Sequence, residues 1–235
     1  MSTAYEGPVA VSAFRFADRE IRVVRPGDPD RLLDDPTVLA WNRRDDYMPY
    51  WAYLWPGAVM LAEAVAGEPL RAGTRTLEIG CGLGLAGLVG LARGLRVLFT
   101  DYDESALEFV ARSVRENGFD PAASSTSRLD WRDPPDDRFP LILAADVLYE
   151  RRLVPLVVDV LIRMLEPGGV ALIADPDRAS AESFPGALEG RGLVLESIRV
   201  IAEVPGHGTV SGTIHRVGWP RPDTLGSLVH GLPPS

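Results

Sequence analysis

The sequence predicts a doubly wound α/β fold, in which helices cover a seven-stranded sheet that is mostly parallel with an antiparallel edge strand. From residue 73 onward, short apolar runs alternate with helical patterns, which is typical of parallel strands joined by crossover helices. Two later apolar runs, 193–204 and 208–219, are separated by the turn sequence PGHG, which predicts an antiparallel pair at the sheet edge. With 235 residues and 46% hydrophobic composition, the chain can bury the core that this fold needs.

Five apolar runs are expected to form the parallel strands. In chain order they are TLEIG (76–80), RVLFTD (96–101), STSRLDW (125–131), LILAADVLY (141–149) and GGVALIAD (168–175). Helical patterns fill 83–94, 103–118 and 151–169, and the last two end in glycine near the expected C-cap. Upstream, 11–24 has the alternation of a small hairpin, and 28–44 has the pattern of a helical lead-in.

The chain is expected to divide into three parts. Residues 1–60 should form the hairpin and an aromatic lid segment packed on the core, and residues 61–220 should form the core itself. Residues 221–235 are rich in turn-forming residues and should form a loosely ordered tail.

Composition narrows the class of protein. The formal charge of −9 disfavours a phosphate backbone, so no nucleic-acid partner is expected. No apolar run reaches the roughly 18 residues that span a bilayer, and the N-terminus does not resemble a signal peptide. One cysteine and three scattered histidines predict neither a disulfide nor a metal site. We therefore expect a soluble, cytoplasmic monomer without a membrane partner.

The stretch TLEIGCGLGLAGL joins an expected strand to a helix through four glycines, Gly80, Gly82, Gly84 and Gly87. Glycine lets backbone N–H groups approach a ligand closely, which predicts a nucleotide-like ligand. The same glycines satisfy the dinucleotide fingerprint, and Asp101 at the end of the next strand could hold a ribose in either case. The glycine pattern alone leaves the choice of ligand open.

Glu78, two residues before the first glycine, favours a cationic ligand, because a carboxylate repels a pyrophosphate. The stretch from Glu78 to Gly84 resembles the first signature of the class I S-adenosylmethionine-dependent methyltransferases, which have a Rossmann-like fold. The resemblance implies S-adenosyl-L-methionine as cofactor, with Asp101 on the ribose hydroxyls and Tyr102 against the adenine. The cofactor residues that it implies are Trp55, Glu78, Gly80, Cys81, Gly82, Gly84, Asp101, Tyr102, Asp130, Trp131 and Ala145.

Further stretches resemble one branch, the protein-lysine N-methyltransferases of methyltransferase family 16 and their bacterial relatives. Asp146 and Tyr149 match the Asp-x-x-Tyr element of this branch, Trp55 matches a tryptophan of its N-terminal segment, and LIADPDR (172–178) resembles its Asp-Pro pair. The resemblance implies N-methylation of a protein side chain such as lysine. Three alternatives stay open: a small-molecule amine methyltransferase, a non-catalytic S-adenosylmethionine-binding protein and a nicotinamide-dependent oxidoreductase.

Methyl transfer to lysine requires a deprotonated amine. The ordinary lysine pKa of about 10.4 makes deprotonation at pH 7 cost roughly 4 to 5 kcal/mol. An apolar slot lowers the amine pKa, whereas a nearby carboxylate orients the amine but raises its pKa. We expect Asp146 to position the amine and Tyr149 to shape the slot, with the proton lost mainly to water before closure. Asp146 could instead cap a helix that begins at Val147.

The segment 47–55 contains five aromatic residues in nine positions. The spacing of Trp51 and Trp55 predicts that both lie on one face of a helical turn, with Tyr53 turned away and Pro56 beginning the next helix. We expect this segment to cover the C-terminal edge of the sheet. Trp55 should lie against the cofactor, whereas Trp51 and Tyr53 should lie nearer the substrate amine.

Overall fold

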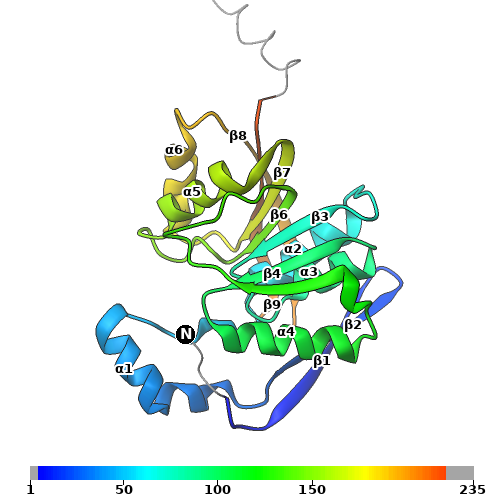
Figure 1. Cartoon of the computed structure of the whole chain (residues 1–235), viewed down its shortest axis with the longest axis vertical. Coiled ribbons are helices and arrows are strands. Elements are labelled where there is room, and N and C mark those ends of the chain that lie inside the picture. Colours follow the sequence, from blue (N-terminus) through cyan, green and yellow to red (C-terminus); the bar gives the residue numbers. More distant parts are fainter. Residues whose placement is uncertain (1–4, 221–235) are drawn as a thin grey trace, which may run out of the picture.

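A seven-stranded sheet with helices on both faces forms the centre of the computed structural model, which describes residues 5–220 (Figure 1). Its strands are β3 (Arg75–Ile79), β4 (Arg96–Asp101), β5 (Ser124–Arg128), β6 (Phe139–Ala145), β7 (Leu165–Asp175), β8 (Val194–Val204) and β9 (Gly208–Gly218). They lie in the order β5-β4-β3-β6-β7-β9-β8, and the first five run parallel. β9 runs antiparallel to both neighbours, and β8 is outermost. The predicted fold class is confirmed, and the expected tail, 221–235, lies outside the described residues.

The order of the strands changes direction next to β3. From β3 the chain passes to β4 and β5 on one side, and then returns to β6 and β7 on the other side. In doubly wound sheets such a reversal opens a crevice at the carboxyl ends of the two central strands. The fold therefore places its crevice where β3 and β6 end.

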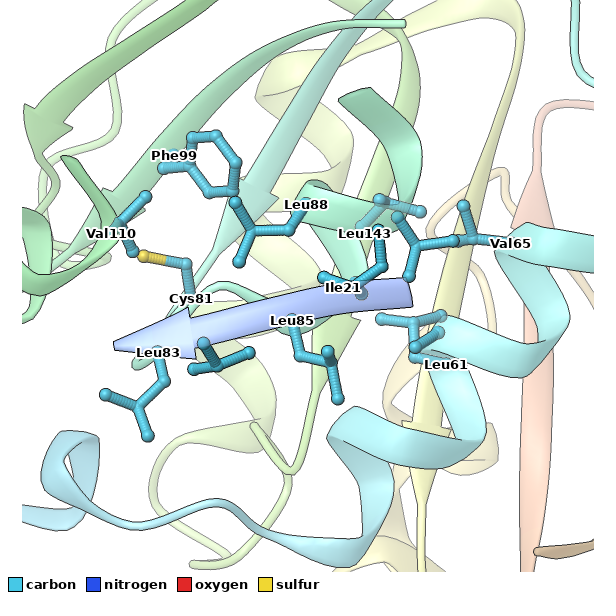
Figure 2. Close-up of a cluster of buried hydrophobic side chains, with 14 of the residues drawn as sticks. Ile21, Leu61, Val65, Cys81, Leu83, Leu85, Leu88, Phe99, Val110 and Leu143 are labelled. Carbon is cyan, nitrogen blue, oxygen red and sulfur yellow. The ribbon is translucent and has the colours of Figure 1, made fainter. Parts of the chain in front are cut away.

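The central strands of the sheet, β3, β4, β6 and β7, are largely buried on both faces. One face packs against α2 (Pro56–Gly67), α3 (Leu85–Ala92) and α4 (Glu104–Glu116), and the other against α5 (Val154–Met164) and α6 (Phe184–Leu188). Along β6, Leu141 and Leu143 belong to the first cluster, whereas Ile142 and Ala144 belong to the second. Figure 2 shows part of the first cluster, where side chains of α2 and α3 meet the sheet. Two buried faces explain why the central strands are largely apolar runs, whereas the edge strand β5 is polar and exposed.

The N-terminal hairpin forms an additional layer outside α4 (Figure 1). β1 (Val9–Phe16) and β2 (Arg19–Pro26) pair antiparallel, as predicted. The backbone N–H of Val24 donates to the hydroxyl of Ser113 in α4 at 2.9 Å, and the N–H of Arg22 donates to Asn117 at 2.9 Å. Ile21 of β2 is 1% exposed and joins the first hydrophobic cluster (Figure 2). The hairpin is thus fixed by both hydrogen bonds and apolar burial.

The hairpin is followed by two short helical elements, η1 (Pro29–Asp34) and α1 (Pro36–Asp45), where the helical lead-in was predicted. The side chain of Asp35 caps α1 by accepting hydrogen bonds from the N–H groups of Thr37 and Val38. No helix among the described residues is both long enough and apolar enough to cross a membrane.

The strand expected over 125–131 ends at Arg128, and two further expected element boundaries are wrong. The helix predicted over 151–169 ends at Met164, because Leu165 is fully buried and pairs with Phe139 as the first residue of β7. Gly168 therefore lies inside a strand and does not cap a helix. The strand predicted over 141–149 ends at Ala145, because Asp146 has a left-handed backbone with φ of +55°. In both places, contacts distant in sequence override the local pattern.

The prediction of a helical turn through Trp51 and Trp55 is also wrong. The short helix η2 covers only Tyr50–Ala52, and Trp55 is extended, with ψ of 153°. Pro56 explains this, because a proline disfavours the helical conformation of the residue before it. Pro56 does begin α2 as predicted, and α2 runs through the expected boundary between residues 60 and 61.

Candidate active site

A cavity of about 780 Å³ lies at the carboxyl ends of the parallel strands, beneath the segment 46–55. All fifteen residues that the sequence suggested for cofactor, catalysis and substrate line it: Trp51, Tyr53, Trp55, Glu78, Gly80, Cys81, Gly82, Gly84, Asp101, Tyr102, Asp130, Trp131, Ala145, Asp146 and Tyr149. The cavity occupies the crevice next to β3 and β6 where a doubly wound sheet holds its ligand. The structure thus brings these residues together, and the role of each stays a prediction.

The glycine loop has a backbone that side chains would disturb. Gly80, Gly82 and Gly84 have φ of +57°, +51° and +73°, in the left-handed region that favours glycine. A Cβ at Gly80 would also lie 2.9 Å from the ring of Trp131. Close packing of Trp131 on the loop therefore places an aromatic wall beside exposed backbone.

Glu78 is buried beneath this loop and 3% exposed. Its Oε2 accepts a hydrogen bond from the N–H of Gly87 at 3.0 Å, inside the first turn of α3. Burial raises the pKa of Glu78 to about 8, against the opposing effect of this hydrogen bond. A cation in the cavity would favour the ionised form of Glu78. The protonation state of Glu78 therefore depends on the charge of the ligand.

Asp101, at the end of β4, braces the loop from the neighbouring strand. Its two oxygens accept hydrogen bonds from the N–H groups of Gly82 at 2.8 Å and Asp103 at 3.0 Å. Burial raises the pKa of Asp101 to about 6. Each carboxylate oxygen can accept a second hydrogen bond, which leaves capacity for two ligand hydroxyls.

Arginines surround the residues expected at the adenine. The guanidinium of Arg128 lies 4.7 Å from the ring centroid of Tyr102, and that of Arg132 lies 5.5 Å from it. Arg132 also pairs with Asp130 at 2.6 Å and lowers the pKa of that carboxyl. Sequence reasoning did not assign these arginines to the site, although both lie within three residues of the Leu-Asp-Trp stretch.

Asp146 directly follows β6 and also lines the cavity. Its Oδ1 accepts a hydrogen bond from Arg178 at 2.6 Å, and a Cβ on Gly57 would lie 2.4 Å from its Oδ2. Burial raises the pKa of Asp146, while Arg178 and the N–H groups at the start of α2 lower it. The alternative that Asp146 caps a helix from Val147 is wrong, because α5 begins only at Val154. Asp146 instead faces the start of α2.

A row of aromatic rings connects the segment 46–55 to Tyr149. Neighbouring ring centroids are 5.9 Å apart for Tyr53 and Trp55, 5.8 Å for Tyr50 and Trp55, and 5.3 Å for Tyr50 and Tyr149. Burial raises the pKa of the Tyr149 hydroxyl above its ordinary value. The Tyr53 hydroxyl donates to Asp30 at 2.7 Å. This aromatic row walls the cavity beside Asp146.

Trp51 is placed differently from its neighbours. It is 6% exposed and packs against Phe109 of α4, with ring centroids 5.6 Å apart. Its backbone lies over the glycine loop, because a Cβ on Gly82 would be 3.4 Å from the Trp51 carbonyl oxygen. Trp51 therefore contributes to the core and backs the loop.

Comparison with known proteins identifies the family. A family model described as lysine methyltransferase matches residues 44–185, which is more than half of the chain. The chain belongs to this lysine methyltransferase family. The matched range includes the aromatic segment, the glycine loop, Asp146 and Arg178, so the family match covers the cavity just described.

Two curated relatives of this chain have names that refer to methylation of different amino acids, lysine in one and histidine in the other. Protein N-lysine methyltransferase METTL21A of Danio rerio is 33% identical over 131 residues, which are 52% of this chain and 59% of the relative. Histidine protein methyltransferase 1 homolog of Dictyostelium discoideum is 31% identical over 128 residues, which are 52% of this chain and 40% of the relative. The matched region thus spans about half the length of these relatives.

Solved structures share the fold of the family member at low identity. Geranyl diphosphate C-methyltransferase from Streptomyces coelicolor superposes with a TM-score of 0.52 at 16% identity, covering 67% of this chain and 77% of that one. Such a likeness supports the arrangement of the sheet and helices and carries no residue role.

Arg178 is a third arginine that sequence reasoning did not assign to this site. It follows β7, its guanidinium pairs with Asp146, and it lies 5.5 Å from the ring centroid of Trp55. The stretch 172–178 was singled out for its Asp-Pro pair, but nothing local indicated where the arginine side chain would point. Three segments distant in the chain meet at this guanidinium.

Proposed function

We propose that this chain is an S-adenosylmethionine-dependent methyltransferase that N-methylates a protein side chain, most specifically lysine. The observation that carries the proposal is that the glycine loop and Asp101 line the same cavity as Asp146 and the aromatic row. Membership of the lysine methyltransferase family and the titles of the curated relatives support the reaction class.

The donor set of the cavity fits S-adenosyl-L-methionine. Asp101 has acceptor capacity for two ribose hydroxyls, and Trp131 and Tyr102 offer aromatic surface for the adenine. Buried Glu78 favours a cationic ligand over a pyrophosphate. The structure of the geranyl diphosphate C-methyltransferase contains S-adenosyl-L-homocysteine, which supports the same ligand class on this fold. The cofactor would supply an electrophilic methyl group on a sulfonium.

The residues of this chain would hold and orient the amine. Asp146 positions its nitrogen, while Tyr50, Trp55 and Tyr149 exclude water and favour a cation through their ring faces, worth about 0.5 to 2 kcal/mol for a cation–π contact. We expect the ring of Trp55 to contact the sulfonium of the cofactor as well as the amine. Exclusion of water lowers the amine pKa, and Asp146 raises it. Proton loss to water before closure satisfies both requirements.

A protein amine is the proposed substrate class, with a small-molecule amine as the rival. The net charge of −9 favours a basic protein over nucleic acid. We also propose that the chain acts as a cytoplasmic monomer. Its single cysteine cannot form an internal disulfide, which fits a reducing compartment.

The test is to incubate the chain with tritiated S-adenosyl-L-methionine and an extract of its source, and to locate the label. The chain contains no lysine, so labelled methyl-lysine after hydrolysis can come only from another protein. Label in methyl-lysine supports the proposal. Label in methylhistidine or in a small molecule would mean that histidine or that molecule is the acceptor and not lysine. Binding without label anywhere would favour a non-catalytic protein, and binding of NAD alone would overturn the proposal.

Two variants assign the role of Asp146 in this assay. We expect Asp146→Ala to lower turnover by about 100-fold, because a misplacement of the reacting groups by about 1 Å can slow a reaction by that factor. Asp159→Ala is the matched control, because Asp159 pairs with Arg191 on the exposed side of α5. Equal turnover by Asp146→Ala and the wild type would remove Asp146 from the reaction.

A further inference from the structure

The guanidinium of Arg178 occupies the position that suits a cationic substrate. It lies between the carboxylate of Asp146, at 2.6 Å, and the ring of Trp55, at 5.5 Å from the centroid. A carboxylate on one side and an aromatic face on the other are the two features that hold an ammonium in a protein. Arg178 therefore already has the contacts that the proposed function gives to the amine of the substrate.

This arrangement leaves buried polar atoms without partners. Among the described residues, buried side-chain atoms without a hydrogen bond include Nε of Arg178, Oδ2 of Asp175 and Oδ2 of Asp146. The N–H groups of Gly57 and Ala58 are near enough to Asp146 to lower its pKa, but they make no hydrogen bond of normal geometry with Oδ2. Asp175 is 1% exposed, and its other oxygen accepts from the backbone N–H of Arg178 at 2.7 Å. Buried polar atoms are normally paired, so this cluster is built for a further polar group or for a second arrangement of the guanidinium.

The side chain of Arg178 can leave without disturbing the sheet. It is 29% exposed, whereas the side chain of Asp146 is 7% exposed, so the arginine reaches the cluster from the solvent side. The backbone of Arg178 is held separately through Asp175. A long arginine side chain can thus rotate toward water while the backbone after β7 stays in place.

We propose that Arg178 is a placeholder cation, which pairs with Asp146 in the free protein and is exchanged for the cationic side chain of the substrate. This inference rests on the proposed function, because it takes Asp146 to be the group that receives the amine. A cation that replaces Arg178 leaves Asp146 paired. A neutral side chain would leave a buried carboxylate unpaired, which is unfavourable. The exchange therefore selects lysine over neutral imidazole or hydroxyl groups.

The experiment measures binding of n-butylammonium, which reproduces the end of a lysine side chain, by NMR titration. We expect Arg178→Ala to bind n-butylammonium at least tenfold more tightly than the wild type, because the competing cation has been removed. Arg178→Lys keeps the charge and should bind as weakly as the wild type. The double variant Asp146→Asn, Arg178→Ala should lose the gain, and n-butanol should bind all four proteins equally.

Four results with the variants would overturn the proposal: no gain in Arg178→Ala, an unchanged gain in the double variant, an equal gain in Arg178→Lys, or an equal gain for n-butanol. The last two would mean that only space was created. If Arg178→Ala does not fold, Arg178→Gln replaces it. In the wild type itself, n-butylammonium should shift the Nε–H resonance of Arg178, and an unchanged resonance would contradict the exchange.

The readout is equilibrium binding, so it is independent of turnover. Failure of the proposed methyltransferase function would show as no binding of S-adenosyl-L-homocysteine, which is measured on the same wild-type sample. Exchange at Arg178 can then be judged whether or not methyl transfer occurs.

Discussion

Three of the carboxyls that line the cavity, those of Glu78, Asp101 and Asp146, have a pKa above the ordinary value. Burial raises the pKa of Glu78 to about 8 and that of Asp101 to about 6, and it raises the pKa of Asp146 as well. Each therefore resists ionisation unless a positive group is near. For Asp146 that group is Arg178. For the other two, a cationic ligand in the cavity would lower the free energy of the ionised form.

Glu78 makes the stability of the free protein depend on pH. Its folded pKa of about 8 exceeds the unfolded value of 4.5, so the folded state binds the proton more tightly. Its contribution to stability is full below about pH 4.5 and is lost as the pH rises through about 8. Relative to Glu78→Gln, the wild type should lose about 3 kcal/mol between pH 5.5 and 8.5, measured by urea unfolding.

Glutamine at this position keeps an oxygen that can accept from the N–H of Gly87, which isolates the effect of charge. Glu196→Gln is the control, because Glu196 is exposed on β8. Parallel stability curves for the wild type and Glu78→Gln would show that Glu78 is ionised over this pH range at no cost.

At the scale of an element, the aromatic segment 46–55 performs two tasks. Trp51 packs into the hydrophobic cluster with Phe109, whereas Trp55 is half-buried and forms the cavity wall beside Arg178. The hydroxyl of Tyr47 donates to Asp103, the N-cap residue of α4, so the segment is also attached to the start of that helix. Core packing and lid position are therefore combined within one short stretch.

Substitution should separate these two tasks. Trp51→Ala should cost about 3 to 5 kcal/mol of stability, because a large buried side chain is removed. Trp55→Ala should weaken binding of S-adenosyl-L-methionine by about 3- to 30-fold with a smaller loss of stability, since a cation–π contact is worth about 0.5 to 2 kcal/mol. Calorimetry of unfolding and of binding measures both. A large fall in Tm for Trp55→Ala, with unchanged affinity for S-adenosyl-L-methionine, would mean that the whole segment serves core packing.

At the scale of the molecule, the walls of the cavity come from distant parts of the chain. The segment 46–55, the glycine loop and the ends of β4, β6 and β7 meet only in the folded state. A ligand that contacts them together binds the folded chain and not the unfolded one. Ligand binding should therefore stabilise the fold by mass action.

S-adenosyl-L-homocysteine at about 100 times its Kd should add about 2.7 kcal/mol to stability. For a chain of this length, that corresponds to a rise in Tm of about 5 to 10 °C. Above about pH 8, where Glu78 is ionised and its carboxylate repels a pyrophosphate, NAD at the same concentration should leave the Tm unchanged. A shift with NAD and none with S-adenosyl-L-homocysteine would favour a dinucleotide site. Differential scanning fluorimetry is sufficient for this comparison.

The sequence by itself determined the order of the strands and helices, the hairpin and the glycine loop, because these depend on local information. Apolar periodicity specifies an element over a few residues, and positive φ at Gly80, Gly82 and Gly84 favours glycine whatever surrounds the loop. Fifteen cavity residues could be named as well, because the carboxyl ends of parallel strands meet at one edge and because these stretches resemble those of the protein-lysine N-methyltransferases.

Only the tertiary structure decided where α5 gives way to β7, that Trp51 is core, and that Arg178 reaches Asp146. Leu165 begins a strand because Phe139 pairs with it, and Trp51 is buried because α4 presents Phe109. The Arg178–Asp146 pair joins residues 32 positions apart. Each of these outcomes depends on free energies of contact between segments that no local pattern contains, which is why the sequence located the cavity but not the cation inside it.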